Sequence, residues 1–413
     1  MMLKCIRWVC VVVLLSGARD GLGQSTAAHP TDTQPSAAVQ KAISLEQQGN
    51  LVGAQAAWDI VVKSEPRNAQ AFAHLGLLRA RQEHYPEAIV AYRKAIALNP
   101  AIPQLKLNLG LALFKSGNFT EAGKVFEAEL KSRPRSPDAG RLTILVGMAH
   151  YGAHEYGAAI PYLKEAVASD PHNLSLLLTL DHCYLWTRQL DATMDVYKQI
   201  LEINPDSAEA DMIAGEALDE KGDNAGAVQQ FRAAAQANPK EPNVHFGLAY
   251  LLWAQKRYDE AIAEFKAELA NDPENSQAMI YLGDTYVQQS QFDQAREVLE
   301  KAVKYKPAEP LIHLDLGIVY METGNKEGAI SELNKTVSLE PDNVTAHFRL
   351  ATLYRSMGKK DEAKVEFAKA SSLNKKTDEG LYKRIADANA RPDSTADGAA
   401  NPDGKQAHPE PPR

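Results

Sequence analysis

Apolar positions recur along this chain with a period of about 34 residues. In all but one of the periods that follow the first, a small residue is followed twelve positions later by an alanine, and four positions after that comes a large apolar side chain. These large side chains are Tyr92, Phe126, Leu163, Tyr197, Phe231, Phe265, Leu299, Leu333 and Phe367. A unit of this length is one supersecondary element that buries its apolar face only against its neighbours. The pattern therefore predicts a solenoid of stacked helical pairs.

Prolines mark the end of every period except the last, where Lys375 stands at this position. They are Pro66, Pro100, Pro134, Pro171, Pro205, Pro239, Pro273, Pro307 and Pro341, evenly spaced except for a longer interval between Pro134 and Pro171. A proline lacks the backbone N–H and disfavours helix in the residue before it, so we expect each one to end the second helix of its unit. The short turn inside a unit is expected to be left-handed at Gly49, Gly117, Gly222, Gly324 and Gly358.

The register of these positions divides the chain into segments. Ten units of equal length fill 35–377, with a three-residue insertion at 137–139: 35–68, 69–102, 103–136, 140–173, 174–207, 208–241, 242–275, 276–309, 310–343 and 344–377. Residues 24–34 form a polar leader, and residues 378–390 are predicted to form a capping helix. Residues 391–413 hold five prolines and no large apolar side chain, so this tail is expected to be disordered.

The spacing of small and large residues resembles the tetratricopeptide repeat, whose pattern is W-x2-L-G-x2-Y, then A-x3-F, then P. The glycines of that pattern are Gly76, Gly110, Gly147, Gly215, Gly283 and Gly317, and its alanines include Ala88, Ala122, Ala261 and Ala329. The resemblance covers most of the chain. It implies an all-α, right-handed α-solenoid (a superhelix) of about ten helix-turn-helix repeats, in which small residues let the two helices of a repeat cross closely.

The fifth unit departs from this pattern. Asp181 stands where the glycine belongs, and Thr193 replaces the alanine. A charged group at a close helix crossing is costly unless it is paired. Either this crossing is wider than the others, or Asp181 meets a donor such as His182 or Arg188.

In the family, the first helix of each repeat lines a concave surface along which partners lie. The resemblance places aromatic, apolar and acidic residues there: Phe114, Tyr151, Trp186, Met212, Glu216, Asp219, Glu220, Phe246, Tyr250 and Trp253. Large aromatics beside polar groups are typical of protein contact surfaces. We therefore expect a protein or peptide partner, with Lys or Arg opposite the acids. Two alternatives stay open: single aromatics pack between neighbouring helices, and the acids form a solvated face.

The N-terminus is predicted to be a signal peptide, residues 1–23. Lys4 and Arg7 precede the apolar stretch 8–15, and small residues follow it. The stretch is short for a membrane span, so we expect no stable membrane insertion unless the signal stays uncleaved. A buried N-terminal helix is the alternative. Cleavage would leave Cys183 as the one thiol, which we expect to be buried, in an exported protein that is periplasmic or extracellular.

Charge and motifs narrow the function further. The net charge of -8 and the lack of a basic stripe argue against nucleic acid as a partner. No nucleophile–base motif, zinc motif or phosphate loop stands out, and the repeats use almost the whole chain. His245, His313 and His347 share one repeat position, so we interpret them as core or intermediate-layer residues, not metal ligands.

We therefore expect no enzyme activity, cofactor or metal. The expected function is an exported protein–protein interaction scaffold, with envelope assembly or secretion as the setting that family analogy suggests. The alternative is a glycan or small-ligand binder that uses the aromatics of the groove.

Overall fold

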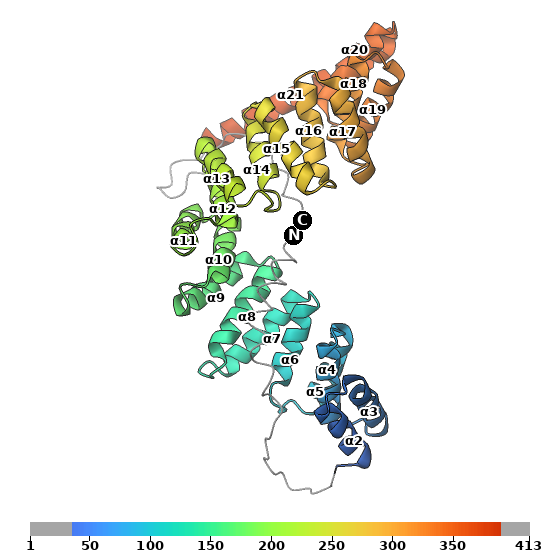
Figure 1. Cartoon of the computed structure of the whole chain (residues 1–413). Helices are drawn as coiled ribbons and strands as arrows, with labels where there is room; N and C mark the ends of the chain where they lie inside the picture. The colour runs from blue at the N-terminus through green and yellow to red at the C-terminus, as the bar shows by residue number, and fades with distance from the viewer. Residues whose placement is uncertain (1–34, 390–413) are drawn as a thin grey trace. The chain divides into compact units, whose positions relative to one another are not determined.

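The computed structural model describes residues 35–389, and this part of the chain is entirely helical (Figure 1). The predicted signal peptide 1–23, leader 24–34 and tail 391–413 lie outside the described residues. The chain divides after Gly222 into two compact bodies, which we call the N-terminal body and the C-terminal body. The all-α fold of paired helices predicted from the sequence is confirmed.

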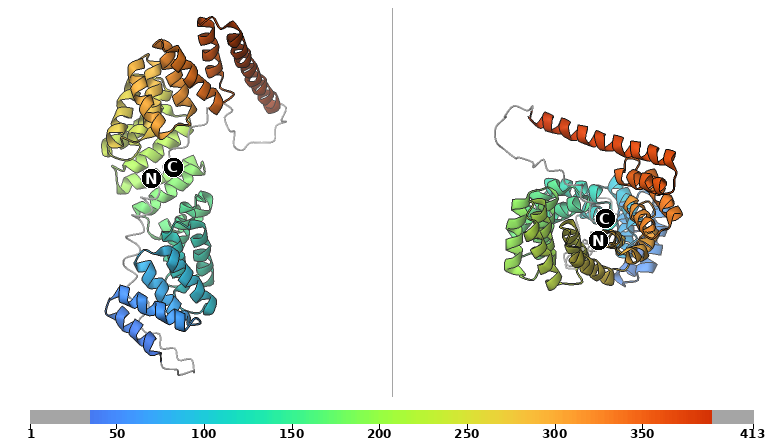
Figure 2. Two further views of the ribbon diagram at one scale, coloured as in Figure 1. Left: turned by 90° about the vertical axis from the view of Figure 1, so that its right-hand side faces the viewer. Right: turned by 90° about the horizontal axis from the view of Figure 1, so that it is seen from above.

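The helices follow one another in pairs. The N-terminal body holds α2 (Ala37–Gln47), α3 (Leu51–Ser64), α4 (Ala69–Arg81), α5 (Tyr85–Leu98), α6 (Leu105–Lys115), α7 (Phe119–Ser132), α8 (Ala139–Gly152), α9 (Tyr156–Ser169), α10 (Leu174–Trp186), α11 (Leu190–Ile203) and α12 (Ala208–Glu220). The C-terminal body holds α13 (Asn224–Ala237), α14 (Val244–Ala254), α15 (Tyr258–Asn271), α16 (Ser276–Gln288), α17 (Phe292–Tyr305), α18 (Pro310–Glu322), α19 (Lys326–Leu339), α20 (Val344–Ser356) and α21 (Lys360–Asn389). Within each body consecutive hairpins lie side by side (Figure 2).

The close crossing of the two helices of a repeat depends on the glycine of the first helix. A Cβ added at Gly76 would lie 2.7 Å from the Tyr92 ring, and one added at Gly110 would lie 2.4 Å from the Phe126 ring. The large side chain of the second helix therefore rests directly on the glycine, and both rings are almost fully buried. This confirms the predicted role of the small positions, since a side chain there would force the helices apart.

The turn inside every repeat is left-handed at the same register position. The five predicted glycines have φ between 74° and 84°. In the other five repeats the position is held, with φ between 58° and 62°, by Glu83, His154, Arg188, Lys256 and Ser290. Side chains with a Cβ are disfavoured in this conformation. The packing of the two helices therefore imposes the turn even where the residue opposes it.

The first helices do not all begin in the same way. In most repeats a side chain one residue before the helix accepts a hydrogen bond from a backbone N–H of the first turn, as Asn68, Asn173, Ser207, Asn275 and Asn343 do. Helices α6 and α14 start later, after Gln104 and Asn243 in the left-handed region. At α14 the buried Glu268 accepts the N–H of Phe246 at 3.1 Å, so a carboxylate from α15 caps this helix.

Two segments depart from the regular repeat: the last helix and the insertion between the third and fourth units. Helix α21 runs without a break from Lys360 to Asn389, so residues 378–389, expected as a separate capping helix, continue the second helix of the last repeat. The insertion at 137–139 lies in the connection from α7 to α8 and in the first residue of α8. Among residues 35–389, no helix is both long and apolar enough to cross a membrane.

Candidate functional site

The predicted contact residues divide between the two bodies and differ in exposure. Phe114 and Tyr151 are only 2% and 7% exposed and belong to the apolar core of the N-terminal body. Phe114 meets Phe119 edge-on at 5.1 Å between ring centroids. Phe114 and Tyr151 therefore pack between helices, which is one of the two alternatives that the sequence left open. They are therefore not part of an accessible surface.

Trp186 is the accessible aromatic residue among those predicted in the N-terminal body. It ends α10, is 39% exposed, and stacks on Tyr156 with ring centroids 5.7 Å apart and an angle of 16° between the ring planes. Tyr156, the first residue of α9, also meets Tyr151 edge-on at 5.9 Å. The pair forms a flat aromatic platform supported from below. Sequence reasoning missed Tyr156 because only first-helix positions were assigned to the surface.

Acidic residues lie on α12, the next first helix along the chain. Met212, Glu216 and Asp219 are half-buried, and Glu220 pairs with Arg188 at 3.3 Å between the guanidinium and a carboxylate oxygen. Burial raises the pKa of Glu216. The four predicted residues of α12 thus form a mixed apolar and acidic patch.

His182 connects the acids to the aromatics. Its Nε2 lies 3.4 Å from a carboxylate oxygen of Glu209, and its ring meets Tyr151 edge-on at 6.4 Å. Burial alone would lower the pKa of His182, but the carboxylates of Glu209 and Glu216 outweigh burial and raise it. The imidazole therefore lies between the aromatic residues and the acids of α12.

Asp181 finds neither of the donors that the sequence suggested. Its side chain is fully buried, and neither carboxylate oxygen has a hydrogen-bond partner. His182 faces Glu209 and Arg188 faces Glu220, so the expectation of a pairing donor was wrong. Burial raises the pKa of Asp181 to about 8. The carboxyl group is thus held in its neutral form at neutral pH, which removes the charge that the crossing could not accommodate.

The C-terminal body gathers its three predicted aromatics around a fourth ring. Phe246, Tyr250 and Trp253 of α14 are half-buried, and all three contact Tyr281 of α16. The ring centroids of Tyr250 and Trp253 lie 5.2 and 5.0 Å from that of Tyr281, both edge-on. Tyr281 was missed because its register position packs between neighbouring first helices.

Two buried aspartates, Asp284 and Asp315, lie on the two first helices that follow α14 along the chain. The indole N–H of Trp253 donates to Oδ2 of Asp284 at 2.5 Å, and Gln288 donates to Oδ1 at 3.1 Å. Asp315 of α18 is 2% exposed, and its Oδ2 has no hydrogen-bond partner. Burial raises the pKa of Asp315 well above its ordinary value, and the neighbouring Asp284 raises it further. Burial also raises the pKa of Asp284.

The three histidines at one repeat position tie the helices of a repeat together, which confirms the interpretation of these residues as layer histidines. The Nδ1 atoms of His245, His313 and His347 lie 2.5–2.7 Å from the carboxylates of Glu264, Glu332 and Glu366 on the following helix. The Nε2 of His313 also lies 2.9 Å from the carbonyl of Pro307. Within residues 35–389, no three metal-ligating side chains gather into a group that could hold a metal ion.

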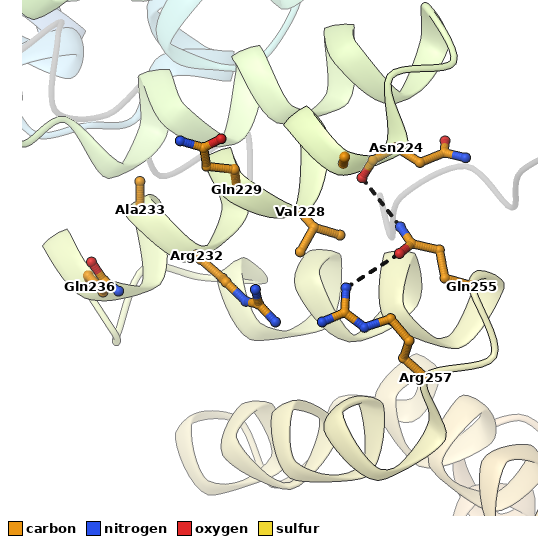
Figure 3. A pocket seen from close by; sticks show the side chains of 9 residues that line it. Asn224, Val228, Gln229, Arg232, Ala233, Gln236, Gln255 and Arg257 are labelled. Atoms are coloured by element: carbon orange, nitrogen blue, oxygen red, sulfur yellow. Dashed lines mark hydrogen bonds between the residues drawn. The ribbon is translucent and has the colours of Figure 1, made fainter.

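A shallow cleft of about 840 Å³ lies elsewhere on the C-terminal body, beside α13 and the turn between α14 and α15 (Figure 3). Gln255 donates from its side chain to the carbonyl of Asn224 at 3.3 Å, and Arg257 donates to Gln255 at 3.5 Å. Arg232 and Arg257, which line the cleft, both pair with Glu260. Its cations are therefore already neutralised, and none of the predicted contact residues lines it.

Comparison with known proteins places this architecture. Three family models described as tetratricopeptide repeat match the chain. The first matches residues 39–103, 75–139, 107–173 and 214–276, and the second matches residues 150–216, 252–313 and 286–338. The third matches residues 344–377. The bovine BBSome complex member BBS4 is 24% identical over 203 residues, or 49% of this chain and 38% of its own. Peroxisome biogenesis protein 5 of Arabidopsis thaliana is 28% identical over 153 residues, or 37% of this chain and 20% of its own.

The chain therefore spans well under half the length of these curated relatives. Among solved structures, the crystal structure of MamA is 24% identical with a TM-score of 0.38, and the match covers 40% of this chain and 96% of that one.

Proposed function

Since this chain belongs to the tetratricopeptide repeat family, we propose that it is a protein-interaction scaffold that binds a partner segment along the first helices of its repeats. The observation that carries the proposal is the platform of Trp186 on Tyr156, a large aromatic surface whose tryptophan is 39% exposed and rigidly supported. Tryptophan side chains in such positions dominate the energetics of protein contacts, because they bury a large area at little cost in conformational entropy.

The charge around the platform supports a partner segment that carries Lys or Arg. Glu216 and Asp219 lie on the same helix as Met212, so acidic and apolar groups alternate beside the aromatics. Complementary charges at the rim of an interface mainly speed association and select the partner. The proposed recognition thus combines an aromatic anchor with electrostatic selection.

We also propose that residues 1–23 direct export, so that the scaffold works in the periplasm or outside the cell, with envelope assembly or secretion as its setting. The basis is the order of Lys4 and Arg7, the apolar stretch and the small residues after it. N-terminal sequencing of the protein recovered from each cell fraction tests this. A chain that starts at Gln24 in an extracytoplasmic fraction is expected, whereas an intact Met1 in the cytoplasm would contradict export.

A glycan or small-ligand binder is the second candidate function. The near-parallel stack of Trp186 and Tyr156 favours it, because a flat aromatic face accepts a sugar ring as well as a peptide. Ligands that bind the folded state raise the melting temperature. A rise with oligosaccharides and none with the captured protein's peptides would favour this second function.

Cross-linking in the native cells followed by mass spectrometry tests the scaffold. The wild type is compared with Trp186→Ala and with Val90→Ala, a control that removes an exposed apolar side chain from a second helix. We expect a specific protein that wild type and Val90→Ala capture and that Trp186→Ala loses. Equal capture by all three variants would exclude the platform as the contact surface. Circular dichroism of each variant shows whether the helices remain intact.

A further inference from the structure

We propose that the last repeat binds an acidic segment of a partner protein that also carries an aromatic side chain, through Phe348 and Arg355 of α20 and Phe367 of α21. The inference rests on the proposed function, because the acidic segment belongs to the partner of the scaffold. It adds a second contact point, in the C-terminal body, whose charge preference is opposite to that of the surface around Trp186.

Phe348 is the most exposed aromatic side chain in the described part of the chain. It is 53% exposed and holds the same register position as Phe246, three repeats earlier, which the sequence assigned to the contact surface. Its ring meets the half-buried ring of Phe367 edge-on, with 5.7 Å between the centroids. An exposed ring that a second ring already holds is a suitable anchor, because covering it costs little conformational entropy.

Arg355 lies on the same side of α20 as Phe348, two helical turns further along the chain. The centre of its guanidinium lies 5.4 Å from the centroid of the Phe367 ring, so Phe367 contacts both residues. Arg355 is exposed, and its side chain forms no ion pair with any described residue. The ring therefore holds the cation in place, while its N–H donors remain available to a carboxylate from a ligand.

The last repeat is basic in a chain that is acidic overall. Residues 344–375 hold seven Lys or Arg and three Asp or Glu, whereas the net charge of the whole chain is -8. Glu366 contacts His347, and Asp361 and Glu362 lie in the first turn of α21, where the helix dipole favours negative charge. Six of the seven basic side chains take part in no ion pair among the described residues: Arg349, Arg355, Lys359, Lys360, Lys364 and Lys369. A negatively charged segment is the complement of this surface.

The cation and the exposed ring together select one kind of ligand. A carboxylate of Asp or Glu can accept two N–H bonds from a guanidinium, and an aromatic ring of the ligand can pack against Phe348. Because Phe348 and Arg355 both contact Phe367, the acid and the ring of the ligand must lie close together, as neighbours in a peptide do. A free inorganic anion would use only the cation, and an apolar peptide would use only the ring.

Fluorescence anisotropy with the full chain and a labelled peptide tests the proposal. The probe is fluorescein-labelled Gly-Glu-Phe-Glu-Gly, amidated at its C-terminus so that only side chains supply negative charge. One comparison peptide carries Gly in place of Phe, which removes the ring. The other carries Gln in place of both Glu, which removes the charge and keeps the shape. Each peptide is titrated at low and at high salt concentration.

The probe should bind about fivefold more tightly than either comparison peptide, because only the probe uses both the cation and the ring. High salt should weaken binding of the probe and leave the Gln peptide unaffected, since salt screens the attraction between exposed charges. Inorganic phosphate at matched ionic strength should not displace the probe. Displacement by phosphate would mean that this surface attracts any anion, which would overturn the proposed selectivity.

Two variants and two matched controls locate the site. Arg355→Gln should weaken binding of the probe about threefold and reduce its salt dependence. Phe348→Ala should weaken binding about fivefold while the salt dependence remains. The controls are Lys369→Gln and Val365→Ala, which change exposed residues two positions on either side of Phe367 and therefore on another face of α21. Both controls should bind like wild type, and circular dichroism checks that each variant keeps its helices.

The outcomes separate this inference from the proposed function. Equal affinity for the probe and either comparison peptide, or unchanged binding in both Phe348→Ala and Arg355→Gln, would overturn the acidic-segment site. An equal loss in Lys369→Gln would do the same, because it would mean diffuse attraction to the whole repeat. If a cross-linked partner is still captured in these cases, the scaffold stands and only this site is wrong. If the probe binds as expected but no partner is captured, the site stands and the scaffold proposal fails.

Discussion

Replacing Asp181 by alanine should stabilise the protein at neutral and alkaline pH. The carboxyl group is fully buried, makes no hydrogen bond, and has its pKa raised from 3.8 to about 8 by burial. Alanine is compatible with this position, because Ala42, Ala249 and Ala351 occupy the same register in other repeats and are fully buried there. The substitution thus removes an unfavourable group without removing a contact.

The magnitude follows from the two pKa values. Between pH 3.8 and pH 7 the carboxyl group ionises in the unfolded chain but retains its proton in the folded one. Each pH unit of this interval costs about 1.4 kcal/mol, so the unfavourable contribution at pH 7 is about 4 kcal/mol. It is absent below the unfolded value of 3.8, grows as the pH rises, and levels off above about 8. Because the chain around Asp181 can relax, we expect a measured gain of about 2–4 kcal/mol.

Urea denaturation of the wild type and Asp181→Ala from pH 4 to pH 9 provides the measurement, with hydrogen exchange of α10 and α11 reporting local stability. The control is Asp195→Ala, an exposed aspartate on α11 that pairs with Lys198. The variant should be more stable at pH 7.5 and similar to wild type at pH 4, while the control changes little at either pH. A gain that does not depend on pH, or a loss of stability at pH 7.5, would refute the assignment of a neutral buried carboxyl group.

Three further tests address the packing. Phe265→Ala removes a fully buried ring and should cost about 2–5 kcal/mol locally, with a less cooperative urea transition; an unchanged midpoint would contradict the repeat register. Lys256→Gly relieves a left-handed residue and should change stability by up to about 1 kcal/mol in the favourable direction, whereas Gly117→Ala should lose about 1 kcal/mol, both read from melting curves. His313→Leu removes the hydrogen bond from the buried imidazole to the half-buried Glu332, which keeps Lys335 as a partner, and should lose about 1–2 kcal/mol, measured by urea denaturation; a stable variant would mean that this tie contributes little.

The sequence alone determined the repeat and its hairpins, because the signals for them are local. Proline ends a helix through its own missing N–H, and the glycine and alanine positions face each other within one unit of the repeat. Gly76 and Tyr92 meet because they lie sixteen positions apart, the same offset as Gly110 and Phe126, and one hairpin spans it. Such short-range pairs can be identified by aligning the chain with itself.

The turn inside each repeat and the fifth repeat show features that the local sequence did not predict. Five of the turn residues are glycine and were recognised, but Glu83 and Ser290 adopt the same left-handed conformation against their own preference. The packing of two helices outweighs a cost of about 1 kcal/mol in one residue. Likewise, the sequence identified Asp181 as anomalous, but only its surroundings decided that it remains unpaired and becomes neutral.

The contact surface was decided mainly by the tertiary structure. Phe114 and Trp186 were both assigned to the same face of the first helices, yet the first is buried in the core and the second is exposed. Tyr281 and Asp284 of α16 meet the aromatics of α14 only because these two first helices pack against each other in the folded chain. Periodicity specifies which side of a helix faces the core, but burial and pairing depend on side chains one repeat away, and that neighbourhood exists only in the folded chain.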